Sequence, residues 1–151
     1  MFATTDREKG ASAVEMAMVA PFLLLLLLGI IEYGFLFGTY NEVRHSSREG
    51  ARIAAVSNVA FDQNGDGVFN EDDIVSYVCE TISLPNGSVT VDLTLNTNTV
   101  GSEAKVTVTA VTPSLSGAPI ISVFLPNSLA NTATFRLEQV ATWASTTATC
   151  P

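Results

Sequence analysis

An uncharged apolar run near the N-terminus constrains the fold of this chain more than any other feature. The sixteen residues Met16 to Ile31 lie between Glu15 and Glu32 and include six consecutive leucines. A helix needs roughly twenty apolar residues, at about 1.5 Å of rise each, to cross a bilayer. Because apolar and aromatic residues resume beyond Glu32, the stretch Ala17 to Phe37 predicts one transmembrane helix. Glu32 would then lie near the outer interface or face a partner.

A short charged segment precedes this run and ends at Gly10. An ordinary secretory signal places its small-residue cleavage site after the apolar region, whereas the plausible site here lies before it. Cleavage between Gly10 and Ala11 would leave the apolar segment on the mature protein as a membrane anchor. Arg7 and Lys9 place the N-terminus in the cytoplasm, so we expect the rest of the chain on the other side of the membrane.

Glu15 is a carboxylate at the edge of the predicted hydrocarbon segment, where an unpaired charge is costly. Cleavage after Gly10 would create an ammonium group on Ala11, four residues away on the same helical face. That amine would belong to the same chain or, in a polymer, to a neighbouring chain. The dipole of the helix N-terminus would favour the carboxylate as well. We therefore interpret Glu15 as the partner of a newly formed N-terminus.

The chain is acidic, with a net charge of -8 and only seven Lys plus Arg. Phosphate contact requires clustered basic side chains, so this composition argues against nucleic-acid binding and favours cations. Arg44, Arg48 and Arg52 would form one stripe if the helix continues through Ser57, and they weaken the orientation signal of the leader. We interpret the stripe as a solvated face, with docking to acidic residues of a neighbouring subunit as the alternative.

Residues 62–73 match the template of a twelve-residue calcium loop. Oxygen-bearing side chains stand at loop positions 1, 3 and 5, a glycine at 6, an apolar residue at 8 and an acid at 12. The predicted Ca²⁺ ligands are Asp62, Asn64, Asp66, the carbonyl of Val68, Asn70 and Asp73. The pattern resembles the loops of dockerin-type EF-hands, and a lone extracytoplasmic loop is expected to bind weakly, with a Kd of roughly 10⁻⁴ to 10⁻³ M. An acidic surface turn without metal is the alternative.

The remaining sequence predicts a small head. Residues Glu71 to Ile82 should form a short helix with one apolar face, ended by Pro85-Asn86-Gly87. Ser88 to Leu95 and Ala104 to Val111 alternate apolar and polar residues, which predicts an antiparallel hairpin, and Thr132 to Thr142 should add a third strand.

The stretch Thr112 to Asn131 contains three prolines and is predicted to be a long excursion across the sheet. Its apolar centre, Ile120 to Leu125, should fill core beside the sheet, or alternatively form an exposed contact patch.

Cys79 and Cys150 are the only cysteines, and both lie outside the apolar run. In an oxidising compartment such a pair predicts a disulfide. Closing a loop of about seventy residues would contribute roughly 4 kcal/mol in the chain-entropy model, which is substantial for a thin core.

The N-terminal third resembles a known family. The stretch from Gly10 to Gly34, Asn41 and the segment Ser46 to Arg52 resemble TadE-like minor pseudopilins of tight-adherence pilus systems, whose precursors carry prepilin-like class III signals. The likeness covers roughly the first 57 residues, and Ala133 to Glu138 is similar to a strand that often closes such chains. It implies a prepilin peptidase that cuts after glycine and requires glutamate at mature position five, here Glu15.

Two departures from the family's major pilins favour a minor or assembly subunit. Major pilins usually carry Glu-Tyr where this chain has Glu15-Met16, and they are much shorter. The resemblance implies, as partners, other pilin or pseudopilin subunits, the pilus assembly platform and membrane lipid, besides the peptidase.

Together these observations predict an α+β protein in three parts. Residues 1–10 form a leader, residues 11–57 a transmembrane and amphipathic helix, and residues 58–151 a pilin-like extracytoplasmic head with a roughly three-stranded antiparallel sheet. We expect a single pass through the cytoplasmic membrane, with incorporation into an extracellular pilus left open. The competing hypothesis is an unprocessed, membrane-anchored calcium-dependent adhesin or surface binding module.

No motif indicates catalysis. His45 is the only histidine and has no recognisable catalytic partner, and the two cysteines do not have the spacing of a zinc site. We therefore expect a protein that is not an enzyme and has no small-molecule substrate.

Overall fold

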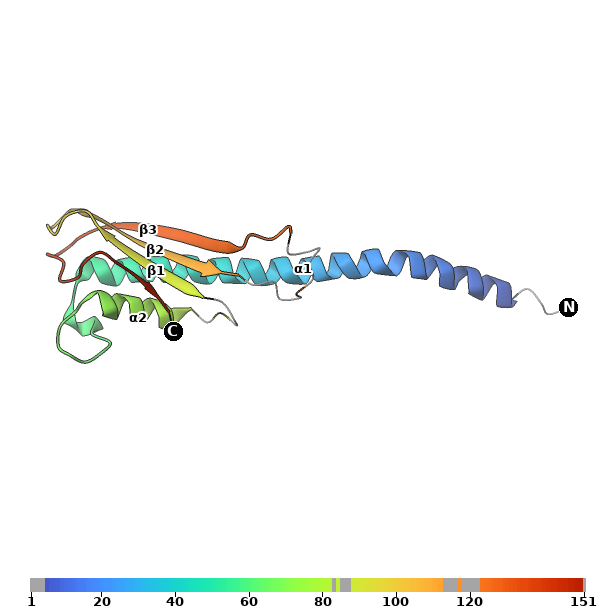
Figure 1. The fold of residues 1–151 in the computed structure, drawn as a ribbon, viewed down its shortest axis with the longest axis horizontal. Helices are drawn as coiled ribbons and strands as arrows, with labels where there is room; N and C mark the ends of the chain where they lie inside the picture. Colours follow the sequence, from blue (N-terminus) through green and yellow to red (C-terminus); the bar gives the residue numbers. More distant parts are fainter. Residues whose placement is uncertain (1–4, 83, 85–87, 113–116, 118–122, 151) are drawn as a thin grey trace.

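The computed structural model describes residues 5–82, 84, 88–112, 117 and 123–150, with side chains from Gly10 onward. Its elements in chain order are α1 (Thr5–Val56), the 3-10 helix η1 (Val59–Phe61), α2 (Glu71–Thr81), β1 (Val89–Leu95), β2 (Glu103–Val111), β3 (Ser128–Arg136) and β4 (Thr146–Thr149) (Figure 1). The sheet is antiparallel, so the predicted α+β class is confirmed.

Helix α1 has two halves with different surroundings. Its N-terminal half projects from the rest of the molecule as an isolated rod, and its C-terminal half packs against the sheet and α2 (Figure 1). Residues Gly10–Val56 form one helix that is long and apolar enough to cross a membrane. Its most apolar stretch of 18 residues is not buried within the protein. This helix fits a single-pass membrane anchor.

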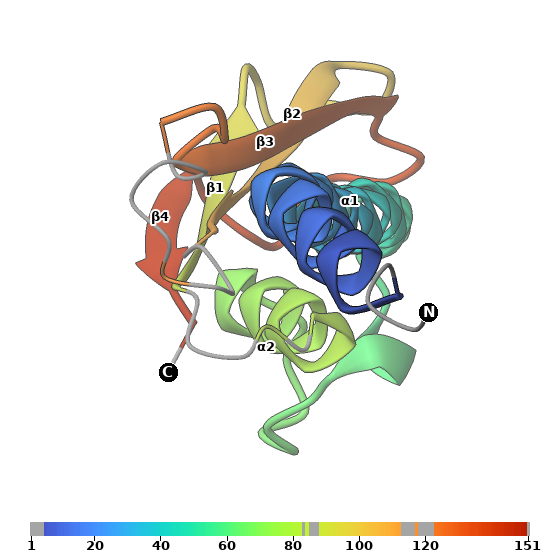
Figure 2. The same cartoon turned by 90° about the vertical axis from the view of Figure 1, so that its right-hand side faces the viewer.

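The C-terminal half of α1 is held between two layers, which with the connecting segments form the head. Viewed along the helix, the sheet covers one side of α1 and α2 lies on the other (Figure 2). The buried side chains of Thr39, Val43, Ser46 and Ile53 recur at three- to seven-residue intervals and mark the covered face. Gly50 lies on the same face, and a methyl group there would lie 2.6 Å from Val78 Cγ2 of α2. The two helices therefore approach closely at Gly50.

The predicted hairpin is present and forms the centre of a four-stranded sheet with strand order β3-β2-β1-β4. Val91 pairs with Val108 and Leu93 with Val106, and all four side chains are buried. The alternation seen in the sequence therefore separates a core face from a solvent face.

Helix α2 also agrees with the prediction. It spans Glu71–Thr81, and Ile74, Val78 and the following Ile82 are buried in the core. The predicted helix breaker at 85–87 lies outside the described residues.

The predicted bounds of the third strand were wrong. β3 spans Ser128–Arg136 instead of Thr132 to Thr142, so its first four residues belong to the sheet and not to the excursion. The polar residue Asn131 lies on the half-buried face of β3, where its side-chain amide donates a hydrogen bond to Ser47 Oγ at 2.6 Å. After Arg136 the chain leaves the sheet, and Trp143 is buried with its indole N–H donating to the Ala54 carbonyl at 3.0 Å.

The expected strand count was one too low, because β4 was missed. Its sequence is Thr-Thr-Ala-Thr, which shows no apolar alternation. β4 pairs antiparallel with β1, and the N–H of Cys150 continues the ladder by donating to the Val89 carbonyl at 2.8 Å. The segment therefore pairs without a hydrophobic pattern of its own, directly before the disulfide-bonded Cys150.

The excursion places apolar side chains at the surface where it is described. Val123 is 78% and Phe124 72% exposed, in agreement with the alternative of a contact patch and not with core filling. The prediction for 120–122 lies outside the described residues.

Candidate functional site

The predicted processing site lies on an accessible part of α1. Gly10, Ala11 and Glu15 are all exposed, and no atom from another segment of the described chain lies within 4 Å of the space a side chain would take at Gly10. Ala11 and Glu15 are four residues apart in one helix and so share a face. Pairing of Glu15 with an Ala11 ammonium requires the cut, because Ala11 otherwise carries a peptide nitrogen.

The second acid of the apolar segment lies in a different environment. Glu32 is only 2% exposed and has an interaction partner, whereas Ile31 and Tyr33 on either side are exposed. Glu32 therefore lies on the covered face of α1. Burial with a partner lowers the cost of a carboxyl group at the end of an apolar span.

The loop between η1 and α2 is held by hydrogen bonds from its own backbone. Asp62 Oδ1 accepts from the Gly65 N–H and Oδ2 from the Gly67 N–H, both at 2.7 Å. Both glycines have positive φ angles, 77° and 84°, as the sharp turns of such a loop require. The Gly67 hydrogen bond is the main reason why the pKa of Asp62 is lowered, so its carboxylate stays ionised.

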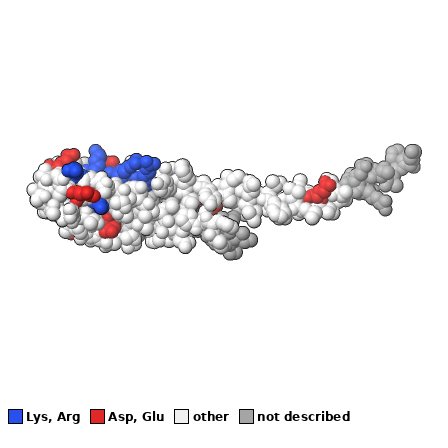
Figure 3. Space-filling model, turned by 90° about the horizontal axis from the view of Figure 1, so that it is seen from above, with Lys and Arg blue, Asp and Glu red and all other residues white. Residues whose placement is uncertain are grey.

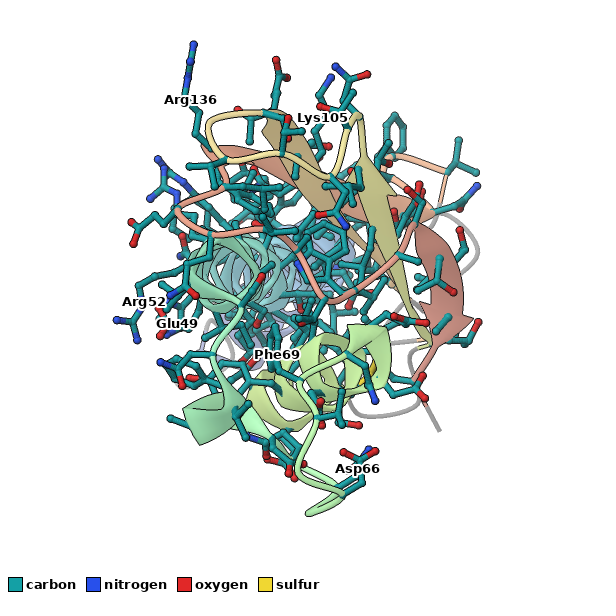
Figure 4. The ribbon with its side chains drawn as sticks, turned by 90° about the vertical axis from the view of Figure 1, so that its left-hand side faces the viewer. Glu49, Arg52, Asp66, Phe69, Lys105 and Arg136 are labelled. Atoms are coloured by element: carbon teal, nitrogen blue, oxygen red, sulfur yellow. A yellow bond between two sulfur atoms is a disulfide. The ribbon has the colours of Figure 1, made fainter. Side chains whose placement is uncertain are left out.

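In the middle of the loop, two more side chains each accept a hydrogen bond from the backbone N–H two residues later. Asn64 Oδ1 accepts from the Asp66 N–H at 2.9 Å, and Asp66 Oδ1 accepts from the Val68 N–H at 2.8 Å. Figure 4 shows Asp66 at the outer end of the loop, away from the sheet. The side chain of Val68 is exposed, and only its carbonyl was a predicted ligand.

The last two predicted ligands form the N-terminal cap of α2. Asn70 Oδ1 accepts from the N–H groups of Asp72 and Asp73, and Asp73 Oδ2 accepts from the Asn70 N–H at 2.9 Å, which completes a capping box. Asp73 is fully buried, and its Oδ1 also accepts from the Gln63 N–H at 2.8 Å. Asp73 thereby ties the start of the loop to the start of α2.

The six predicted ligands thus belong to one loop, but their acidic groups do not form a metal-binding cluster. Among the described residues, no three His, Cys, Asp or Glu side chains lie close enough together to hold a metal ion. A carboxylate oxygen that accepts one N–H keeps a further lone pair, so these hydrogen bonds do not preclude a cation. Calcium binding stays a prediction.

The predicted disulfide is present. Cys79 on α2 and Cys150 after β4 are bonded, with their Cα atoms 5.5 Å apart. The bond connects the residue after the edge strand β4 to α2.

The arginine stripe on α1 is exposed, as a solvated face requires. Arg52 Nη2 lies 2.7 Å from Glu49 Oε1, and this hydrogen bond raises the pKa of Arg52 (Figure 4). The Lys and Arg side chains drawn in blue in Figure 3 lie on the head, and the stretch of α1 from Met16 to Ile31 carries no charged residue.

Polar contacts inside the head were not predicted from the sequence. Ser46 on α1 accepts a hydrogen bond from Thr81 on α2 at 3.0 Å, and the Ser47 contact with Asn131 joins α1 to β3. Serines in a helix give no sign of distant partners. The single tryptophan was the one available clue, because a buried indole N–H usually finds an acceptor.

Comparison with known proteins covers the N-terminal part. Residues 10–52 match the family described as TadE-like protein. This range contains the predicted cleavage site, Glu15, the apolar span and the arginine stripe, and it ends before the loop and the sheet. No curated protein and no solved structure matches the chain. The match supports a TadE-like protein and suggests an association with the Tad pilus.

Proposed function

We propose that this chain is a minor pilin, or pseudopilin, with a structural or assembly role in a tight-adherence type IV pilus system. The observation that carries the proposal is the apolar half of α1, which projects from the head with its side chains uncovered (Figure 1). A surface of this kind must be covered by lipid or by other apolar helices, because exposure to water is unfavourable. For a pilin-like subunit, both lipid and the apolar helices of other subunits would cover this surface.

The TadE-like match of residues 10–52 supports the same role, because it covers the apolar half of α1 from Gly10 onward. We propose that a prepilin peptidase cuts after Gly10 in the cytoplasmic membrane, and that the head lies on the extracytoplasmic side. The new Ala11 ammonium would then neutralise Glu15, within the chain or on a neighbouring subunit. Neutralisation lowers the cost of placing the acid among packed apolar helices.

In the proposed assembly, α1 docks against helices of other pilin subunits or of the assembly platform. Tight helix packing in lipid favours small residues at the contact. Gly34 and Gly38 lie one turn apart on α1, and among the described residues no atom of another segment lies within 4 Å of the space a side chain would take at either. These positions are therefore available to a partner helix.

We also propose that Ca²⁺ binds the loop at residues 62–73 and stabilises the joint between α1 and α2. The spacing of its oxygen-bearing side chains supports this role, as does the lowered pKa of Asp62, which keeps that carboxylate charged. The role would be structural, because one weak site senses little at extracellular calcium concentrations.

The mature N-terminus decides between this proposal and an unprocessed adhesin. Mass spectrometry of the protein from its native membrane should find Ala11 as the first residue, and Gly10→Leu should abolish this processing. Gly29→Leu is the matched control, because Gly29 lies in the same helix with open space around it and outside the cleavage site. A mature chain that begins at Met1 would instead support the membrane-anchored adhesin.

A further inference from the structure

The exposed turn at Val123 and Phe124 differs from the rest of the head surface. These two neighbouring side chains are the most exposed large apolar residues of the described head. The sequence from Val106 to Phe135 contains no charged residue, although the chain as a whole is strongly acidic. Scattered exposed apolar residues are ordinary, but two neighbouring exposed apolar side chains in an uncharged segment indicate a contact surface.

A hydrogen bond fixes the position of the turn along α1. Tyr33 Oη donates a hydrogen bond to the Phe124 carbonyl at 3.3 Å. Counted from Met16, roughly twenty residues of helix cross the hydrocarbon, which brings the outer boundary to about residue 35. Tyr33 therefore lies in the last turn before that boundary, and its hydrogen bond holds Phe124 at the same level.

The surroundings of the turn suit lipid rather than water. On α1, Ile30 and Phe37 are exposed on either side of Tyr33, and Glu32, the only charged residue between Glu15 and Tyr40, is buried. The first arginine of the head is Arg44, almost two helical turns beyond Phe37. The Phe124 carbonyl is already bonded, which removes part of the cost of bringing irregular backbone toward a bilayer.

We propose that Val123 and Phe124 insert into the outer interface of the bilayer beside α1, and thereby give the head a second contact with lipid. Aromatic and apolar side chains beside a hydrogen-bonding tyrosine are the residues that favour this zone. The contact would seat the head on the membrane and limit tilting of the head and α1 relative to the bilayer. The inference depends on the proposed membrane anchoring of α1.

The experiment measures the environment of a fluorescent label in the full chain. Both native cysteines are in the disulfide, so one introduced cysteine provides the only labelling site. Phe124→Cys, labelled with nitrobenzoxadiazole and reconstituted in phosphatidylcholine vesicles, should show blue-shifted emission and quenching by lipids spin-labelled near the headgroup.

Two matched variants make the result interpretable. Ile30→Cys reports whether the span is in lipid, and Val100→Cys labels an exposed valine in the turn between β1 and β2, at the opposite end of the head (Figure 1). An aqueous label at 124 with a lipid-embedded label at 30 would overturn this inference and leave the anchor intact. An aqueous label at 30 would overturn the anchor and the inference together.

A third outcome would assign the turn to protein contact. If the label at 124 is shielded only at high protein-to-lipid ratio, and spin-labelled lipid does not quench it, then a second copy of the chain covers the turn. That result would overturn the lipid contact.

Discussion

Gly50 shows how a single residue sets the distance between two helices. Its position on α1 faces Val78 of α2, and a methyl group there would lie 2.6 Å from Val78 Cγ2. Valine is stiff in a helix, so it cannot rotate away without cost. The close contact of α1 with α2, and through α2 with the loop, therefore requires a residue without a side chain.

Gly50→Ala should destabilise the head. Overpacking typically costs about 1–3 kcal/mol, which exceeds the gain of up to about 1 kcal/mol from replacing a helical glycine. The measurement is chemical unfolding of the full chain in detergent, followed by the circular dichroism of the sheet.

Gly38→Ala is the control for Gly50→Ala. It makes the same chemical change in the same helix, but within the part of the chain that the structure describes no atom of another segment lies within 4 Å of the space the added methyl group would occupy. Its head should be as stable as the wild type or slightly more so. Equal stability of the two variants would contradict the close helix contact.

At the scale of elements, the loop at residues 62–73 and the edge strand β4 depend on constraints other than hydrophobic burial. The loop is shaped by side-chain oxygens that accept its own N–H groups, with Asp73 joining both ends. β4 is a four-residue threonine-rich strand joined to α2 by the disulfide that follows it. Each element should respond to removal of its own constraint.

Millimolar Ca²⁺ should raise the melting temperature of the head, because a cation that binds only the folded loop stabilises it by mass action. Asp62→Ala should abolish this response. Glu80→Ala removes one exposed acid from the other end of α2 and should retain it. A wild-type melting temperature indifferent to Ca²⁺ would remove the site.

Acid should weaken the loop independently of calcium. The folded pKa of Asp62 lies below its ordinary value of about 3.9. The stabilisation by its carboxylate is therefore fully present above that ordinary value and is lost as the pH falls through the folded pKa. In chelator, acid titration of the wild type and of Asp62→Asn should diverge in this range, with the wild type losing more stability. Parallel curves would contradict the role of Asp62.

Removal of the disulfide by Cys79→Ser with Cys150→Ser should destabilise the head by roughly 4 kcal/mol in the chain-entropy model, less any strain relieved. Hydrogen exchange should rise first where β4 pairs with β1, at the N–H groups of Val91 and Leu93, because β4 contributes a single apolar residue, Ala148. The β2–β3 ladder on the opposite side of the sheet serves as the internal control. Uniform acceleration across both ladders would show that the bond stabilises the whole head and not this edge.

At the scale of the molecule, the chain divides between an apolar rod and a self-contained head. The described core residues begin at Val43, and none of the most apolar window of α1 is buried by the protein. In the proposed role, assembly and folding would therefore use different parts of the same helix.

A chain that begins at Glu32 should remain soluble and keep the unfolding free energy of the full chain within about 0.5 kcal/mol, because it loses no core contact. Ultracentrifugation and thermal unfolding beside the full chain in detergent provide the measurement. Pelleting of the shortened chain, reversed by Phe124→Ser, would assign the remaining insolubility to the exposed turn at 123–124. Loss of the folded head would contradict the division.

Local patterns in the sequence sufficed for several features. The apolar run predicted α1, the alternation at residues 89–95 and 104–111 predicted the hairpin, and a lone pair of cysteines predicted the disulfide. At residues 62–73 the glycines predicted sharp turns, and both adopt positive φ angles, whereas the calcium binding that the spacing predicts stays a prediction. The helix, the hairpin and the turns depend on residues that are near neighbours along the chain. The disulfide pairing follows because the chain has only two cysteines.

Only the tertiary structure decided which polar residues enter the core and where the outer strands lie. Asn131 of β3 donates a hydrogen bond to Ser47 of α1, and β4 pairs with β1 beside the disulfide that joins Cys150 to the distant Cys79. Glu32 is likewise a polar residue that is buried and has an interaction partner. Periodicity along a chain records the preference of a residue for water or core, whereas a hydrogen-bond partner from a remote segment can reverse that preference.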